Sequence, residues 1–302
     1  MISKKYATFH MLILNEDKYI DGACISVSTY REYGNNEIEH NIMIDKSIST
    51  KGIKKLKKYF DNVMTIPLKE IDSNFQLRTK KLEIRYGKLI DYAWTKWYVL
   101  WFDSYVKVLF CDIDTLAVDS YVNIFEISTP AWCTYQKVSL QNKRLSLLSS
   151  SLKSGDVMTD TFIKKYTKHN IKNLCNSKNI SFIPVNASIV LLSPSKEKFR
   201  KMKSYIDEQL QNYKMLKSIS PSSGSDENLL FKFYFCKLQV PVYTIGPEYL
   251  ATEWLLTKSS AFKFVKKPII LNYDTTDKPW LKNREKMYNE EKRWDELRKK
   301  YL

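Results

Sequence analysis

One apolar run, residues 106–111, constrains the fold of this chain more than any other feature. It is rich in β-branched and large apolar side chains, which is typical of a strand buried on both faces in the middle of a parallel sheet. Asp112 and Asp114 follow it directly. Ligands of open α/β sheets bind at the carboxyl ends of such strands, and two carboxylates with this spacing can hold a divalent cation together with a diphosphate. The alternative is that both aspartates only cap the end of the strand.

Strands and helices alternate along most of the chain. Because this alternation is typical of βαβ units, we expect an α/β fold with a mostly parallel central sheet flanked by helices, and right-handed connections between the strands. The expected strands cover residues 6–14, 41–44, 62–67, 131–135 and 182–192, and the expected helices cover 19–30, 53–60, 92–104, 195–216 and 227–236.

We expect a single domain over residues 1–282. Within it, the Ser-, Lys- and Asn-rich residues 139–181 are interpreted as an insertion or lid. Residues 283–302 are strongly charged and predict a C-terminal helix, which Met287, Trp294 and Leu297 could dock on the body or use as the interface of a homodimer.

Composition excludes several classes of protein. The 302 residues are 44% hydrophobic and carry a formal net charge of +16, but the lysines are spread along the chain, so nucleic-acid binding is not the function we expect. No stretch approaches the roughly 18–20 apolar residues that cross a bilayer. The five cysteines are scattered without a Cys-x-x-Cys pair, from which we expect reduced thiols, no zinc site and a cytoplasmic location.

Four separated segments, taken in order, resemble the glycogenin-like retaining glycosyltransferases (glycosyltransferase family 8), which have the GT-A fold. The match extends over most of residues 6–281 and looks closest to the small branch carried by insect-infecting large DNA viruses, for which the location would be the host-cell cytoplasm. The segments are the opening strand with Asn15, Tyr19 and Gly22, then residues 95–97 and 107–116, then 186–188 with 224–230, and last Lys278-Pro279-Trp280 after the strand 268–272.

The resemblance implies transfer of a hexose from a UDP-sugar to an acceptor with the help of Mn2+, or alternatively Mg2+. In this family the counterpart of Asp114 binds the metal, that of Asp112 contacts both the metal and the ribose, and that of Lys278 contacts the donor phosphates. Carboxylates suit these cations far better than zinc. For Lys278, the competing interpretation is an ordinary surface lysine.

The resemblance also assigns roles around the donor sugar and the base. Asp226 lies where the family has an acidic residue beside the reacting carbon, although it could equally be a helix N-cap. The mechanism stays open between a covalent intermediate and same-face substitution. The other residues placed at the donor are Lys96, with a surface lysine as the alternative; Arg85, with Arg78 competing; Asn15 and Tyr19 at the uracil, with a core role as the alternative for Tyr19; and Asn186 and Ser188 beside the sugar.

The chain departs from the family pattern at Asn272, where the family usually has a histidine as third metal ligand. An asparagine carbonyl can ligate a hard cation, but the change could weaken the site, and Asp274 or Asp277 could compensate. Two rival functions therefore remain. A nucleotidyltransferase would want a Gly-rich loop after the first strand, which residues 14–18 lack; an inactive donor-binding protein would act through its basic surface. The identity of the sugar and the acceptor, and self-glycosylation, cannot be read from the sequence.

Overall fold

The computed structural model describes residues 5–14, 17–69, 89–134, 153–158, 185–211, 230–252, 267–273, 278–280 and 289–302. The chain divides into two compact units. Unit 1 consists of Met1–Pro67, Tyr105–Glu126 and Pro247–Leu302, and unit 2 consists of Leu68–Ser104 and Ile127–Gly246. Most of the expected insertion at 139–181, and the first residues of the expected C-terminal helix, lie outside the described residues.

The sheet of unit 1 is parallel, as the strand–helix alternation predicts. Its strands are β1 (Tyr6–Leu12), β2 (Ile38–Ile44), β3 (Asn62–Thr65) and β4 (Lys107–Cys111), in the order β3-β2-β1-β4. All three pairings between them are parallel. The expected apolar run becomes β4, in which residues 108–111 are completely buried. The prediction of an α/β fold with a mostly parallel sheet is confirmed.

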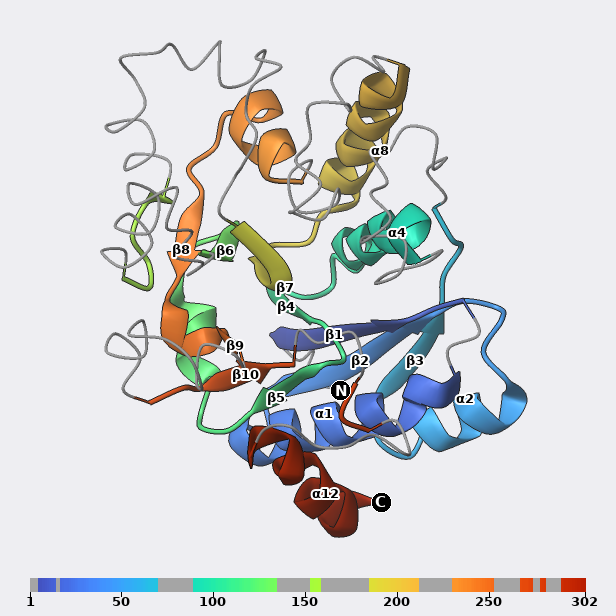
Figure 1. The fold of residues 1–302 in the computed structure, drawn as a ribbon. Coiled ribbons are helices and arrows are strands. Elements are labelled where there is room, and N and C mark those ends of the chain that lie inside the picture. Colours follow the sequence, from blue (N-terminus) through green and yellow to red (C-terminus); the bar gives the residue numbers. More distant parts are fainter. Residues whose placement is uncertain are drawn as a thin grey trace, which may run out of the picture. The chain divides into compact units, whose positions relative to one another are not determined.

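The helices α1 (Ile20–Tyr33) and α2 (Thr50–Leu56) lie together on one side of this sheet (Figure 1). Helix α1 follows directly after the short 3-10 helix η1 (Asp17–Tyr19). Helix α2 follows Ser49, whose Oγ accepts a hydrogen bond from the Gly52 backbone N–H at 2.9 Å and so caps the helix. The apolar faces of both helices and of the sheet form one core cluster, which contains Leu12, Ile20, Ala23, Cys24, Val27, Ile42, Ile44, Ile48, Leu56 and Phe60.

Unit 1 also contains a three-stranded sheet, in which a strand from the middle of the sequence pairs with a strand close to its end. Strand β10 (Ile270–Asn272) pairs antiparallel with β5 (Thr115–Ala117) and parallel with β9 (Ala251–Thr252). The short helices η4 (Val122–Glu126) and η7 (Pro247–Tyr249) complete this part of the unit. Because only three residues separate the end of β4 from the start of β5, this pairing brings residues near 272 close to the two aspartates.

The C-terminal helix α12 (Asn289–Tyr301) packs on α1 within the same unit. Trp294 is 1% exposed and belongs to a core cluster with Trp280 and Tyr273, and Leu297 packs against that cluster. The expected docking of the tail is therefore confirmed. Trp294 is used in this contact and is not exposed as the dimer interface that the sequence suggested.

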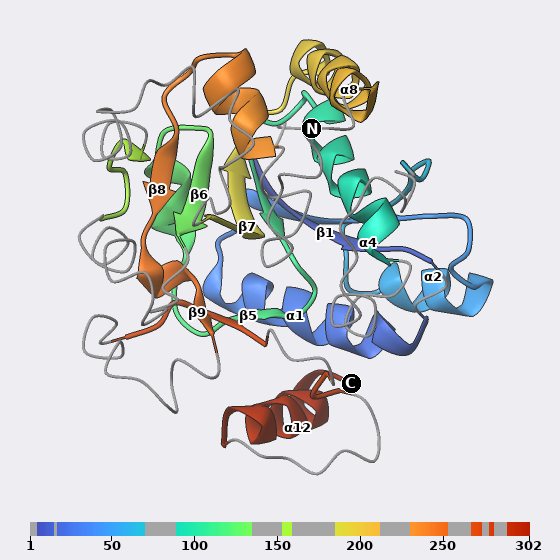
Figure 2. The ribbon, with the colours of Figure 1, turned by 45° about the horizontal axis from the view of Figure 1, so that its top comes forward.

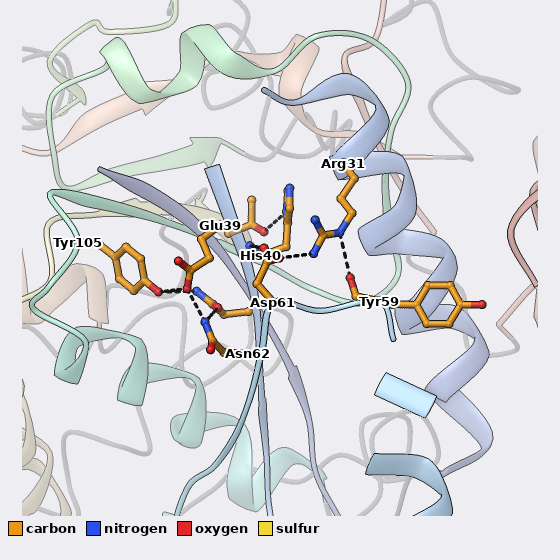
Figure 3. Close-up of polar contacts among 9 residues, drawn as sticks. Arg31, Glu39, His40, Tyr59, Asp61, Asn62 and Tyr105 are labelled. Carbon is orange, nitrogen blue, oxygen red and sulfur yellow. Dashed lines mark hydrogen bonds and ion pairs between the residues drawn. The ribbon is translucent and has the colours of Figure 1, made fainter. Parts of the chain in front are cut away.

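A network of polar side chains lies at the edge of the parallel sheet where the strands β2, β3 and β4 begin (Figure 3). The Tyr105 hydroxyl donates to Glu39 Oε1 at 2.5 Å, and Asn62 donates to the same carboxylate and to Asn41. Beside it, Asp61 accepts from the His40 backbone N–H and forms an ion pair with Arg31 at 2.8 Å. These groups satisfy one another and hold β2 and β3 in register, so we interpret this edge as structural.

Unit 2 has the strands β6 (Ala131–Thr134), β7 (Val185–Leu192) and β8 (Tyr243–Ile245). Strand β6 pairs antiparallel with β7 and parallel with β8. The helix α8 (Lys196–Gln211) packs beside the 3-10 helix η3 (Ala93–Trp101) (Figure 2). The ring of Phe199 contacts those of Tyr98 and Trp101. The remaining elements are α4 (Leu89–Tyr92) and the π-helix η6 (Phe233–Lys237).

The cysteines depart from the sequence-based expectation. Cys24, Cys111 and Cys133 are free and buried, but Cys236 is disulfide-bonded. The expectation of reduced thiols throughout is therefore wrong, and cysteine usage no longer argues for a reducing compartment. Among the described residues, none of the helices has the length and apolar character that a membrane span requires.

Candidate functional site

The carboxyl ends of the parallel strands β1, β2 and β4 lie at one edge of the sheet in unit 1. The segments that follow β1 and β2 are joined there by a hydrogen bond. Leu14, after β1, has a φ of 65°, in the left-handed region that a leucine rarely adopts. Its backbone N–H donates to Asp45 Oδ1 at 3.0 Å, and Asp45 follows β2. Backbone strain of this kind concentrates at ligand sites. Asp45 was not predicted from the sequence, although it is an acidic residue directly after a buried strand, the same signal that Asp112 gives.

Asp112 and Asp114 lie in the tight turn that joins β4 to β5. The turn is closed by the Asp112 carbonyl oxygen, which accepts from the Thr115 backbone N–H at 3.1 Å and from the Thr115 hydroxyl at 2.7 Å. The backbone and Thr115 therefore fix the turn, while both aspartates are only partly exposed. The Asp114 carboxylate takes no part in the two hydrogen bonds that close this turn, and it pairs with a side chain from another segment.

That partner is Lys278. The Lys278 Nζ donates to Asp114 Oδ2 at 2.5 Å and to the Tyr273 carbonyl oxygen at 3.0 Å. The two charged side chains are only 18% and 15% exposed, respectively. Lys278 is therefore not an ordinary surface lysine. The second carboxylate oxygen, Asp114 Oδ1, is buried and has no hydrogen-bond partner among the described residues.

Asn272 ends β10 and is 1% exposed. It pairs with Thr115 across the sheet, and the next residue, Tyr273, donates its backbone N–H to the Asp114 carbonyl oxygen at 2.9 Å. The chain segment that replaces the family's histidine is thus held directly beside the turn of the two aspartates. Asp274 and Asp277, which could compensate for the change, lie outside the described residues.

Aromatic packing fixes the segment that carries Lys278. Trp280 lies 4.7 Å from Trp294 between ring centroids and meets the ring of Tyr19 edge-on at 5.7 Å. Gly22 allows this approach, since a Cβ there would lie 2.6 Å from Trp280 Cε2. Tyr19 packs against the core clusters on both sides, which supports its interpretation as a core aromatic; its contact with a uracil base stays a prediction.

The residues at this turn fit a hard divalent cation. Two carboxylates and an amide oxygen are the ligand types that Mn2+ and Mg2+ prefer. The buried Asp114 Oδ1 gives a second, independent indication, because a buried carboxylate oxygen without a partner is costly. The described part of the chain has no group of three or more His, Cys, Asp or Glu side chains that could hold a metal, so the amide of Asn272 would have to supply the third protein ligand.

Unit 2 contains three of the other predicted residues. Lys96 lies in η3 and is only 7% exposed, so the alternative of a surface lysine is wrong. Next to it, the Thr95 hydroxyl accepts the Lys69 backbone N–H at 3.0 Å. A buried lysine nearly always has a specific partner or role.

Asn186 and Ser188 lie in β7 where its pairing with β6 is irregular. Trp132 pairs with Val190 and the next residue, Cys133, pairs with Asn186, so residues 187–189 bulge out of the ladder. The Asn186 side-chain oxygen accepts the Ser188 backbone N–H at 2.6 Å and closes the bulge as an Asx turn. Bulges are frequent beside active sites, where they redirect side chains.

Asn15, Arg85 and Asp226 lie outside the described residues, so their predicted roles remain predictions. Unit 2 also holds a residue that the sequence analysis did not select, Lys232, which is 4% exposed and whose pKa is lowered by burial. Its only sequence signal is its place, six residues after Asp226 in an apolar helix.

The fold described here is that of the GT-A class of glycosyltransferases. Solved structures that share it include an active-site mutant of LgtC, with a TM-score of 0.62 and 13% identity over 97% of this chain and 95% of that chain. The galactosyltransferase LgtC in complex with donor and acceptor sugar analogs gives a TM-score of 0.56 and 14% identity, covering 98% and 96% of the two chains. The bifunctional glycosyltransferase WbbM gives 0.57 and 11%, covering 99% of this chain and 50% of its own.

Identities this low establish a common fold and no more. No protein-family model matches the sequence, and no curated protein matches it at a significant level.

Proposed function

We propose that the chain is a metal-dependent retaining glycosyltransferase that transfers a hexose from a UDP-sugar to an acceptor. The observation that carries this proposal is the partly buried ion pair of Asp114 with Lys278 at the carboxyl end of a buried strand in a GT-A fold. A diphosphate donor needs both a cation site and a direct positive contact, and this turn supplies a candidate for each.

The family resemblance implies a role for each of the predicted residues. Asp112, Asp114 and Asn272 would hold Mn2+ or Mg2+, which when bound stabilises the negative charge of the leaving diphosphate as a Lewis acid. Lys278 would contact the donor phosphates, and Asp45 would hold the loop after β1 through the Leu14 backbone. Asn15 and Tyr19 would bind the base.

The family resemblance also implies residues that would bind the sugar. Asn186 and Ser188 would contact it from the bulge of β7, and Lys96 and Arg85 would lie near the sugar or phosphates. Asp226 would stand by the reacting carbon, as a nucleophile or as a positioning group. The acceptor (a glycan, a protein or a small polyol), the cytoplasmic location, the homodimer and the viral branch are further expectations that come from sequence alone.

The test is hydrolysis of a panel of UDP-sugars with Mn2+, comparing the native protein with Asp114→Ala. We expect turnover of one donor and a loss of at least about 100-fold in the variant, because the leaving group would lack its cation. The matched control is Asp119→Ala, which removes a carboxylate of the same unit that pairs with an exposed lysine, Lys267; its turnover should stay native. Equal turnover in Asp114→Ala and the native protein would refute the proposed site.

A second function is favoured by one observation, the replacement of the family's histidine by Asn272. An inactive donor-binding protein would keep Mn2+-dependent UDP binding and show no turnover on any donor, with or without acceptors. Isothermal titration with UDP, carried out beside the hydrolysis panel, separates this case from the active enzyme.

A further inference from the structure

The ion pair between Lys278 and Asp114 joins the two groups that the proposed function assigns to different ligands. The Lys278 ammonium would contact the diphosphate, and the Asp114 carboxylate would bind the cation. In the structure these two groups pair with each other, at 2.5 Å and with little exposure to water. Any ligand that binds here must therefore change the partner of a charge that is already paired.

Each ligand alone faces an unfavourable exchange. A cation on Asp114 would share its carboxylate with the Lys278 ammonium, and two positive charges so close together in a partly buried site repel each other. If Lys278 moved away instead, its ammonium would keep, among the described residues, the neutral Tyr273 carbonyl oxygen as a partner. Removing one member of a buried ion pair is costly for this reason.

The two ligands together make a balanced exchange. The cation takes the place of Lys278 on Asp114, and the diphosphate takes the place of Asp114 on Lys278. No charge is then left in the partly buried turn without a counter-charge. The geometry supports this exchange, because Asp114 Oδ1 is already buried without a described partner, whereas Oδ2 is the atom that the lysine holds.

We infer that the Lys278–Asp114 ion pair is an internal competitor for both ligands, so that cation and nucleotide diphosphate bind weakly alone and tightly together. This inference rests on the proposed function and adds to it: Lys278 opposes the binding of the cation when no nucleotide is present. A lysine that only contacts phosphate would have no effect on the cation alone.

The decisive measurement is the affinity for Mn2+ without nucleotide, followed by electron paramagnetic resonance. The native protein is compared with Lys278→Met, which keeps the length of the side chain and removes its charge, and with Lys278→Arg, which keeps the charge. We expect Lys278→Met to bind Mn2+ alone about 10-fold tighter than the native protein, within the usual range of coupling between sites, and Lys278→Arg to stay within about 3-fold of it. Lys267→Met, at an exposed lysine of the same unit, controls for the loss of one positive charge.

The reciprocal measurement is UDP binding in EDTA to Asp114→Asn. Because this substitution frees Lys278, we expect metal-free UDP to bind more tightly than to the native protein, again by about 10-fold, whereas Asp119→Asn should change little. This second arm keeps the inference testable if Lys278→Met does not fold.

The outcomes separate the inference from the function on which it rests. If Mn2+ binding is lost in Asp114→Asn but is unchanged or weaker in Lys278→Met, the site is correct and the competition is wrong. If Mn2+ binds equally to the native protein and Asp114→Asn, and UDP binds to neither, the proposed function itself fails.

Discussion

At the scale of single residues, the burial of His10 has a direct consequence for stability. His10 lies in β1 and is fully buried, edge-on to the rings of Tyr30 and Phe60. Burial, and to a lesser degree the nearby His40, lowers its pKa to about 3. An ordinary histidine has a pKa near 6.5, so below that pH the unfolded chain binds a proton that the folded chain refuses.

We therefore predict that His10 makes the fold sensitive to acid. Its contribution is fully present above pH 6.5 and is lost as the pH falls towards 3, by up to about 1.4 kcal/mol for each pH unit. Replacing it by leucine in His10→Leu should make the free energy of unfolding fall less steeply between pH 7 and pH 4.5, as measured by urea denaturation at each pH. Carboxylates contribute to both proteins alike, so identical slopes would contradict the prediction.

Single residues of the candidate site could be predicted, but their pairing could not. Asp112 and Asp114 stand out because they follow a buried strand, and Lys278 because Pro279 and Trp280 follow it. The contact between Asp114 and Lys278 joins residues 164 positions apart, and nothing in the sequence specifies which of many charged side chains will meet. The burial of Lys96 was equally hidden, because a lysine in an aromatic helix looks the same on either face.

At the scale of elements, the packing of α12 on the rest of unit 1 supports the candidate site. Trp294 contacts both Trp280 and Tyr273, and Tyr273 supplies the carbonyl oxygen that Lys278 binds. Ion pairs of Arg298 with Asp21 and of Lys300 with Glu32 add contacts between α12 and α1. These surface pairs are worth little individually, so the buried tryptophan should dominate.

Truncation of that tryptophan tests the element. We predict that Trp294→Ala lowers the free energy of unfolding by about 3–5 kcal/mol, as is usual when a buried tryptophan is removed, and weakens Mn2+-dependent UDP binding. Lys299→Ala, at an exposed position of the same helix, should change the free energy of unfolding by less than about 0.5 kcal/mol. Urea denaturation and titration calorimetry measure the two effects, and native UDP affinity in Trp294→Ala would separate α12 from the site.

The contact between α1 and Trp280 gives a second test at this scale. An alanine in place of a helical glycine usually stabilises by about 1 kcal/mol, but the added Cβ of Gly22→Ala would meet the Trp280 ring at 2.6 Å. We predict that this variant gains no stability and binds UDP with Mn2+ more weakly, because Trp280 and with it Lys278 are displaced. Ser28→Ala is the control, because the Ser28 hydroxyl donates to the Cys24 carbonyl oxygen of its own helix.

The regular elements were largely predictable, and the irregular ones were not. Long apolar or periodic segments such as β1, α1 and β4 carry their own signal. The helix expected from residue 195 also begins there, because Ser195 Oγ accepts from the Lys198 backbone N–H at 3.3 Å and caps α8. The bulge of β7, the 3-10 winding of η3 and the positive φ of Leu14 depend on contacts with distant segments. These irregular features lie where ligands are expected, so the functional detail was the part that the sequence concealed.

At the scale of the whole molecule, the two units interleave along the chain, and no linker or change of composition marks their limits. The division into two units could therefore not be predicted from the sequence.

The disulfide at Cys236 could not be predicted either, because scattered cysteines do not reveal which of them come together. We predict that titration of the denatured, unreduced protein with a thiol reagent finds fewer than five free thiols, and that all five appear after reduction. Five thiols before reduction would contradict the bonded state of Cys236.

The long separation between Asp114 and Lys278 also sets the order in which the site can be made during synthesis. A nascent chain that has emerged as far as β5 already has the aspartates, the parallel strands and α1, but lacks β10, Lys278, Trp280 and α12. For the next 160 or so residues of synthesis, the acidic turn lacks the one lysine that pairs with Asp114 in the structure. The proposed donor site is therefore among the last parts of this sequence to be completed, after the sheet that carries its aspartates.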